Sequence, residues 1–281
     1  MKGPGLLLAL LFASALSAQT ERTVTILAIA DWKGDFAVDQ KGRGGLAAFL
    51  ALKRRIEQKI APRGGSVIAV HAGQFTQATL STALEDSLKR PDPGLIQYVG
   101  FSALTFSKQE RALLEKTSLD LPVVERECTP KAKCKTEIIT ANSTLKWWIT
   151  GLDPLKDRKS DALLRDLESS AHKADADFSI LLLSEPQTEA IFAGQTGNVH
   201  SAVGELGRFL VIESGKKNLF YRDPAGPYVC IVAGRSICRV DLTFRGSLIG
   251  VSQKFIDPNG ASEPGEFIKP DPVLMDQFFR P

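Results

Sequence analysis

The sequence predicts a single α/β domain in which two mixed β-sheets pack together and are flanked by helices. In the first two thirds of the chain, apolar strand-like runs alternate with amphipathic helical runs, which is the pattern of a sheet covered by helices. In the last third, short β-like runs separated by Gly, Pro and Asp are typical of antiparallel strands joined by tight turns. No Pro-rich linker or internal repeat divides the chain.

Each element has a local signal. The β-branched and apolar run at residues 23–30 is typical of a strand buried on both faces, and an amphipathic helix follows the glycines at 42–45 until Pro62 and Gly64-Gly65 end it. Further strands are expected at residues 66–70, 103–106, 137–141, 145–150 and 178–183, and further helices at 109–116 and 160–173. In the last third the expected strands are residues 209–213, 219–221, 228–233, 239–244 and 248–254.

Residues 1–18 have the layout of a secretory signal peptide. Lys2 gives a positive start, an apolar run covers residues 6–16, and small residues follow it. That run is shorter than the roughly 20 residues that a transmembrane helix needs. We therefore expect export to the periplasm or the extracellular space, and a mature chain, residues 19–281, that is one domain without an integral membrane segment. An uncleaved N-terminal anchor is the alternative.

The composition excludes one class of partner. The chain has 281 residues, 43% of them hydrophobic and 24% charged, which is ordinary for a globular protein. The net charge of +3 is too small to predict either a nucleic acid or an anionic membrane as the partner, and we discard nucleic-acid binding.

The four cysteines form two local pairs, Cys128 with Cys134 and Cys230 with Cys238. Because an exported protein meets an oxidising environment, we expect a disulfide within each pair. A zinc site built from all four is the alternative, but neither spacing is Cys-x-x-Cys and no histidine lies close to either pair. Of the three histidines, only His71 is expected at the end of a strand.

The loops just after the expected strands resemble a known family. The segment from Ala30 to Phe36, followed by Gly44-Gly45, resembles the Asn-Asp-x-His-Gly and Gly-Gly-helix start of secreted 5′-nucleotidases in the calcineurin-like metallophosphoesterase superfamily. Residues 67–74 resemble the family's strand ending in Ala-Gly-Asp, and residues 100–110 resemble its Gly-Tyr-Asp-Ala-x-x-x-Gly-Asn-His-Glu segment. Further on, residues 178–185 resemble its strand ending in Ser-His. Residues 199–208 resemble, more loosely, its Gly-Gly-His-x-His segment. The resemblance covers nearly all of the mature chain and implies a four-layer sandwich, but the family's C-terminal nucleotidase domain has no counterpart.

The resemblance also implies a site in which two divalent metals activate water and hold a phosphate ester. The corresponding positions here are Asp31, Lys33, Gln74, Lys108, Gln109 and, in the later part, Glu185, Leu206 and Arg208. Asp31 is the expected residue type, but cations and amides stand where the family has histidine, aspartate and asparagine. Such a donor set suits divalent metals poorly, so we expect no metal cofactor.

These substitutions predict a pseudoenzyme that binds a small anion or an envelope protein. The alternative is a divergent phosphoesterase with a reduced site, in which Asp31 acts with Asp35, Glu110 or Glu185; a purely structural role is a third hypothesis. Lys33, Lys108 and Arg208 are the candidates to bind the anion, since fixed cations can hold phosphate or carboxylate. They could instead neutralise Asp31 and Glu185 in an ion-pair network, and Asp31 could simply cap a turn.

Overall fold

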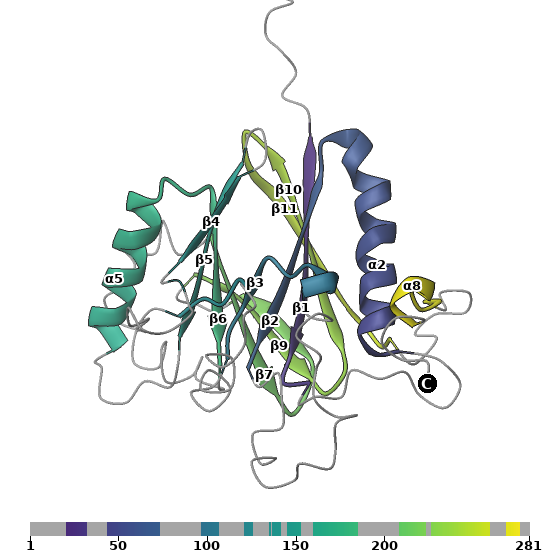
Figure 1. Cartoon of the computed structure of the whole chain (residues 1–281). Helices are drawn as coiled ribbons and strands as arrows, with labels where there is room; N and C mark the ends of the chain where they lie inside the picture. The colour runs from purple at the N-terminus through teal and green to yellow at the C-terminus, as the bar shows by residue number, and fades with distance from the viewer. Residues whose placement is uncertain are drawn as a thin grey trace, which may run out of the picture.

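A computed structural model describes residues 21–32, 44–73, 97–106, 121–125, 135, 137–141, 145–152, 160–184, 208–222, 226–258 and 268–275. In these ranges two β-sheets pack face to face, with helix α2 (Gly45–Ile60) on the outer face of one sheet and α5 (Ser160–Lys173) on that of the other (Figure 1). This is the mixed α/β architecture that the sequence predicts.

The first sheet combines the start and the end of the described chain. Its strands, in the order β11-β10-β1-β2-β3, are β11 (Ser247–Ile256), β10 (Ile237–Arg245), β1 (Arg22–Ala30), β2 (Ser66–Ala72) and β3 (Ala103–Leu104). The strands β1, β2 and β3 run parallel, whereas β10 is antiparallel to both β1 and β11. The last third of the sequence therefore completes the sheet that β1 begins.

The second sheet has six strands. In the order β4-β5-β6-β7-β9-β8 they are β4 (Ile138–Ala141), β5 (Lys146–Leu152), β6 (Phe178–Leu183), β7 (Phe209–Gly215), β9 (Tyr228–Ala233) and β8 (Leu219–Arg222). The expectation of antiparallel neighbours in the last third is right for β8 with β9 and for β10 with β11. It is wrong for β7 and β9, which pair in parallel while β8 lies at the edge. The reason is burial: β9 carries Val229, Cys230 and Val232 on both faces of the sheet, whereas the four residues of β8 are half-buried or exposed.

Three apolar layers hold these elements together. Between α2 and the first sheet, Leu46, Phe49 and Ile56 of the helix pack on Leu27 and Ile29 of β1. The layer between the sheets contains the inward residues of β1, β6 and β7, and a third layer lies between the second sheet and α5. The adjacent Trp147 and Trp148 point to opposite faces of β5, the first between the sheets and the second under α5, as alternation along a strand requires.

A glycine lets the sheets approach each other closely. A Cβ on Gly151 of β5 would lie 2.3 Å from the backbone oxygen of Val124 and 2.4 Å from Cγ2 of Thr105. Val124 belongs to a short segment that extends the first sheet, because its N–H donates to the carbonyl of Leu104 at 2.8 Å. Any larger residue at position 151 would have to push the two sheets apart.

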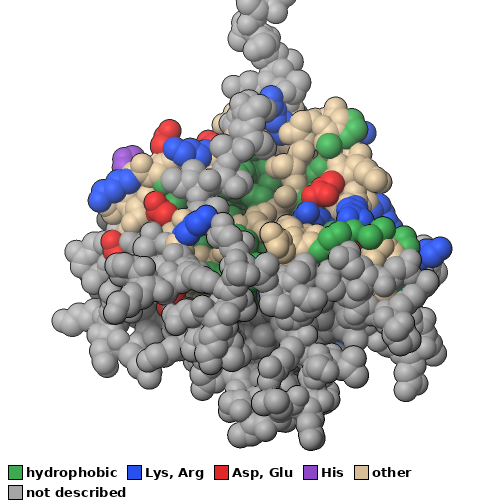
Figure 2. Space-filling model, in the orientation of Figure 1, with side chains coloured by type: hydrophobic (Ala, Val, Ile, Leu, Met, Phe, Trp, Pro, Cys, Tyr) green, Lys and Arg blue, Asp and Glu red, His purple; other side chains and the backbone are tan. Residues whose placement is uncertain are grey.

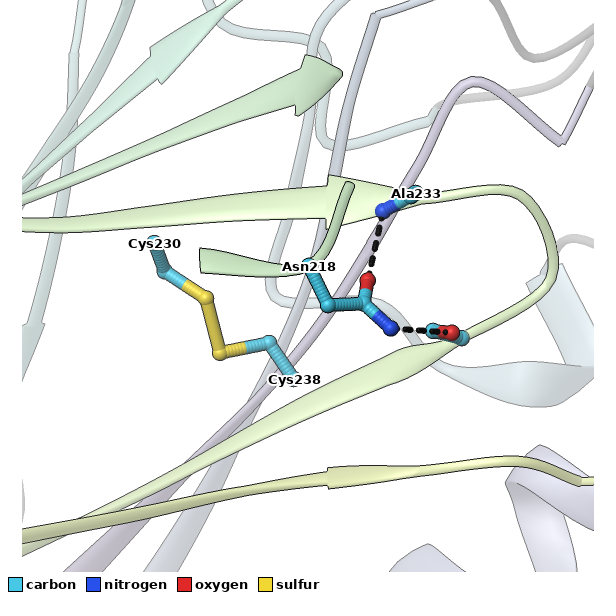
Figure 3. The surroundings of a disulfide bond; sticks show 5 residues. Asn218, Cys230, Ala233 and Cys238 are labelled. Atoms are coloured by element: carbon cyan, nitrogen blue, oxygen red, sulfur yellow. Dashed lines mark hydrogen bonds between the residues drawn. A yellow bond between two sulfur atoms is a disulfide. The ribbon is translucent and has the colours of Figure 1, made fainter. Parts of the chain in front are cut away.

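A disulfide joins the sheets covalently. Cys230 on β9 of the second sheet is bonded to Cys238 on β10 of the first, with an S–S distance of 2.06 Å, so the predicted local pairing is confirmed for this pair (Figure 3). Close to this disulfide, the side chain of Asn218, which lies between β7 and β8, binds the turn between β9 and β10. It accepts from Ala233 N at 2.7 Å and donates to Ser236 Oγ at 2.8 Å. Cys128 and Cys134 lie outside the described residues, and their pairing stays a prediction.

Short helical segments complete the described chain. The 3-10 turn η1 (Ala61–Arg63) follows α2 directly, and α8 (Pro272–Leu274) belongs to a C-terminal segment that lies against α2. Asp271 fastens this segment, since its N–H donates to Ala47 O at 3.0 Å and its carboxylate pairs with Arg54. Among the residues described, no helix is long and apolar enough to span a membrane.

Candidate functional site

The carboxyl ends of parallel strands from both sheets meet at one edge, which we call the carboxyl edge. Asp31 follows β1, Gly73 follows β2 and Ser184 follows β6. A Cβ on Gly73 would lie 3.4 Å from Asp31 N and 3.4 Å from the Ser184 carbonyl oxygen, so the three strand ends are in contact. Because open α/β sheets bind ligands at such strand ends, this edge is the candidate site.

The backbone at this edge is held by hydrogen bonds. Asp31 N donates to Ala72 O at 3.0 Å, and Gly73 N donates to the Thr105 hydroxyl at 3.2 Å. Both the N–H and the hydroxyl of Ser184 donate to Leu152 O, at 3.0 and 3.1 Å. These hydrogen bonds fix the ends of β1, β2 and β6 against the neighbouring backbone and against Thr105, which follows β3.

Buried polar side chains are concentrated near the same edge. Of the ten buried polar or charged residues in the described part of the chain, seven lie in the last three positions of a strand, directly after a strand, or directly after the bridge residues 123–124: His71, Thr105, Glu125, Thr150, Ser184, Glu213 and Ser214. Sequence reasoning singled out His71 but not the carboxylates Glu125 and Glu213. The signal that would have found them is a glutamate that closes an apolar run, at 121–124 in one case and at 209–212 in the other.

Asp31 has an unusual backbone conformation. Its φ is +54°, in the left-handed region that aspartate and asparagine tolerate better than most residues. It is half-buried, and the next residue, Trp32, is buried against Phe49 of α2 with 6.5 Å between the ring centroids. The chain therefore turns sharply at the point where β1 leaves the sheet.

His71 is a fully buried residue in the interior of the sheet. It lies in register between Ile29 of β1 and Leu104 of β3. Burial lowers its pKa to about 3 from the ordinary value of 6.5, and a backbone hydrogen bond with Thr105 partly offsets this effect. The imidazole is therefore neutral at neutral pH and is no cationic partner for an anion.

The structure does not bring Arg208 to Asp31. Arg208 directly precedes β7, and its carbonyl accepts from Ser179 N at 2.8 Å, at the start of β6. Ser184, at the carboxyl edge, is five residues further along the second sheet, which is roughly 17 Å at the rise of a strand. Arg208 thus lies at the opposite edge, and the loose alignment of residues 199–208 gave no indication of this.

The other predicted site residues lie outside the described ranges: Lys33, Gln74, Lys108, Gln109, Glu185 and Leu206. All of them except Leu206 come within three residues after described residues of the carboxyl edge, since Trp32, Gly73, Phe106 and Ser184 end their described segments there. These positions thus follow the carboxyl edge in the sequence, and their assignment to a site stays a prediction.

The donor set does not fit two divalent metals. Within the residues described, no three His, Cys, Asp or Glu side chains are grouped as a metal ion requires. The positions that the resemblance assigns add two lysines and two glutamines, and a lysine ammonium donates hydrogen bonds but has no lone pair for a metal. The resemblance thus assigns to this edge fewer anionic and imidazole donors than two divalent metals take in that family.

Comparison with known proteins identifies the fold. No protein-family model and no curated protein sequence matches the chain. Among solved structures, it is similar to a 5′-nucleotidase of Candida albicans, with a TM-score of 0.63, 10% identity, and coverage of 89% of this chain and 55% of the nucleotidase. It is also similar to the sulfate thiohydrolase SoxB of Thermus thermophilus, with a TM-score of 0.62, 13% identity, and coverage of 90% and 59%.

A third similar structure is matched over nearly its whole length. This is the calcineurin-like phosphoesterase YfkN of Bacillus subtilis, with a TM-score of 0.57, 13% identity, and coverage of 91% of this chain and 95% of that one. The present chain thus spans less than two thirds of the nucleotidase and of SoxB. At these identities the likeness establishes the fold, which is that of the calcineurin-like phosphoesterases and 5′-nucleotidases.

Proposed function

We propose that this metallophosphoesterase-like protein is non-catalytic and uses the carboxyl edge to bind a small anion or an envelope protein. One observation carries the proposal. The edge where the fold brings Asp31, Gly73 and Ser184 into contact is continued in sequence by Lys33, Gln74 and the Lys108-Gln109 pair. A two-metal site needs anionic and imidazole ligands at those positions.

The chemistry of these residues favours binding without turnover. The neutral amide of Gln74 lacks the anionic oxygen that holds two dications together, and lysines repel a dication. A lysine can nevertheless hold a phosphate or a carboxylate as a compact point charge. It cannot convert water into a nucleophile at neutral pH as a metal does, so a ligand would be held but not hydrolysed.

A phosphoesterase with a reduced site is the second candidate. It is favoured by the position of Asp31 at the carboxyl edge and by the buried carboxylates of Glu125 and Glu213 near the same edge. Oxygen donors of this kind suit a hard divalent cation. Asp35, Glu110 and Glu185, which follow described segments of the edge in sequence, are the further donors to test.

Export is part of the proposal. The layout of residues 1–18 supports it, and so does the disulfide between Cys230 and Cys238, since such bonds persist in oxidising compartments. Cell fractionation together with the mass of the mature N-terminus tests it. A reduced protein that is recovered from the cytoplasm with residues 1–18 intact would contradict it.

Metal analysis and a phosphatase panel test the absence of catalysis. We expect the purified protein to contain no stoichiometric divalent metal. Bis(p-nitrophenyl) phosphate and AMP should be hydrolysed no faster by the wild type than by Asp31→Asn, with or without manganese. Turnover that rises with manganese and disappears in Asp31→Asn would establish the reduced-site hydrolase instead.

Calorimetric titration with phosphate and nucleotides tests the anion site. The double variant Lys33→Ala with Lys108→Ala should lose binding that the wild type shows. Its matched control is Lys216→Ala with Lys217→Ala, which removes two exposed cations from the turn after β7. Negligible binding by the wild type would reject the anion site and leave the ion-pair network as the role of the two lysines.

A further inference from the structure

Within the described residues, cations outnumber acidic residues at the end of the molecule opposite the candidate site. We call this end the amino edge, because the parallel strands of both sheets begin there. Eight Lys or Arg residues of the described ranges lie at strand or helix ends of this edge: Arg22, Lys59, Arg63, Lys146, Lys173, Arg208, Arg222 and Arg245. The small net charge of the whole chain, +3, gives no indication of this arrangement.

The two sheets contribute to one continuous edge. Trp147, at the start of β5, packs on Phe244 of β10 with 5.7 Å between the ring centroids, and Phe244 is the register partner of Arg22 at the start of β1. Arg22 Nε lies 3.9 Å from the Cβ position of Gly64, which follows Arg63. In Figure 2 the Lys and Arg atoms of the described residues lie in the upper part of the molecule, where Asp and Glu atoms are also visible between them.

Acidic residues neutralise only part of this charge. Four lie at the same strand and helix ends in the described ranges: Glu21, Glu57, Asp175 and Asp177. Glu21 pairs with Arg245 at 3.1 Å, with both side chains more than half exposed, and Glu57 pairs with Lys53 one turn back along α2 at 3.1 Å. Exposed pairs of this kind contribute little stability. Eight cations against four acidic residues make the described part of the amino edge net cationic.

The N-terminal stretch joins the molecule at this edge. Glu21 and Arg22 start β1 there, so the apolar run at residues 6–16 is connected to the amino edge by a few residues. Before any cleavage, an apolar segment held in a bilayer would keep this edge near the lipid headgroups. Basic residues are attracted to anionic phospholipids within about a Debye length of the surface.

We propose that the amino edge is a docking surface for an anionic phospholipid membrane. The cations of both sheets then face the headgroups, and the carboxyl edge with Asp31 faces away from the membrane. The inference does not depend on whether the protein hydrolyses or merely binds its ligand, because the two edges lie at opposite ends of the strands. It goes beyond the proposed function by assigning an orientation and a second partner.

Vesicle co-sedimentation tests the docking surface. The protein as purified, with its N-terminus determined by mass spectrometry, is mixed with neutral phosphatidylcholine vesicles or with vesicles that contain phosphatidylglycerol. We expect stronger binding to the anionic vesicles, weakened by raising NaCl from 0.1 M to 0.5 M. Removing two cations as Arg63→Gln with Arg208→Gln should lower the preference for anionic vesicles roughly 30-fold, given the contribution of each basic residue near such a surface.

The control removes two cations from the carboxyl edge. Lys216→Gln with Lys217→Gln changes the net charge equally, and both lysines are exposed in the turn after β7. This variant should keep the wild-type preference. An equal loss in both variants would show unspecific charge attraction and overturn the proposal. An acidic protein as the true partner would leave the wild type without preference for anionic vesicles, which would also overturn it.

Discussion

Acid should destabilise this protein through His71 in a predictable amount. The histidine is fully buried, and burial lowers its pKa to about 3, against 6.5 for the exposed side chain. Between pH 6.5 and pH 3 the unfolded chain therefore binds a proton that the folded chain excludes. Stability contributed by the neutral imidazole is fully present above pH 6.5 and is lost as the pH falls. At pH 5 the loss from this one residue is about 2 kcal/mol.

Urea unfolding of the wild type and of His71→Gln at pH 7 and pH 5 measures the contribution of His71 to the change of the unfolding free energy with pH. Other groups titrate in the same interval, so the informative quantity is the difference between the two proteins. The wild type should lose about 2 kcal/mol more than His71→Gln between the two pH values. Any effect of the substitution on stability at pH 7 cancels, because only the change with pH enters the comparison. His172→Gln is the control, because His172 is exposed on α5.

An identical pH dependence in the wild type and in His71→Gln would refute the reasoning. It would mean that the imidazole takes up a proton as readily in the folded protein as in the unfolded one. A nuclear magnetic resonance titration of the histidine ring protons would then be expected to show His71 titrating near its ordinary value while the protein stays folded.

Three further outcomes follow from packing and covalent links. Gly151→Ala should cost about 1 to 3 kcal/mol of unfolding free energy because a backbone oxygen occupies the space, whereas Gly250→Ala, whose nearest neighbour would be 3.7 Å away, should be well tolerated. Replacing both Cys230 and Cys238 by alanine should cost about 2.5 kcal/mol on the chain-entropy estimate, and a reductant should then have no further effect on the melting of this turn. Asp271→Asn should cost about 1 to 2 kcal/mol, measured by urea unfolding, because a charge-assisted bond to the arginine of α2 is weakened.

The sequence predicts most elements well because their signals are local. The helix α5 and the strands β6 and β9 coincide with the predicted ranges, and β1 begins one residue before its predicted start. Runs of apolar and β-branched residues between polar ends are sufficient for this. The disulfide between Cys230 and Cys238 was also predictable, since a short turn separates its two strands.

What the sequence alone does not predict depends on contacts between distant segments. Nothing in the local pattern of β8 places it outside β9, or places β10 beside β1 from the opposite end of the chain. For the same reason Arg208 was assigned to the wrong neighbourhood: a loose alignment has no information on which end of a strand a residue occupies. The gathering of eight described cations at the amino edge is likewise a property of strand direction.

The conformation of Asp31 affects how this position should be tested and interpreted. A non-glycine residue with φ of +54° carries a steric cost that aspartate and asparagine bear better than alanine does. Asp31→Ala would therefore combine loss of the carboxylate with backbone strain, whereas Asp31→Asn removes the charge alone. An aspartate at the end of β1 also suits the left-handed backbone conformation that the turn requires, so this conformation explains its presence without a catalytic role. A glycine at position 31 would adopt the same conformation equally well. Asp31→Gly therefore removes the carboxylate while keeping the turn.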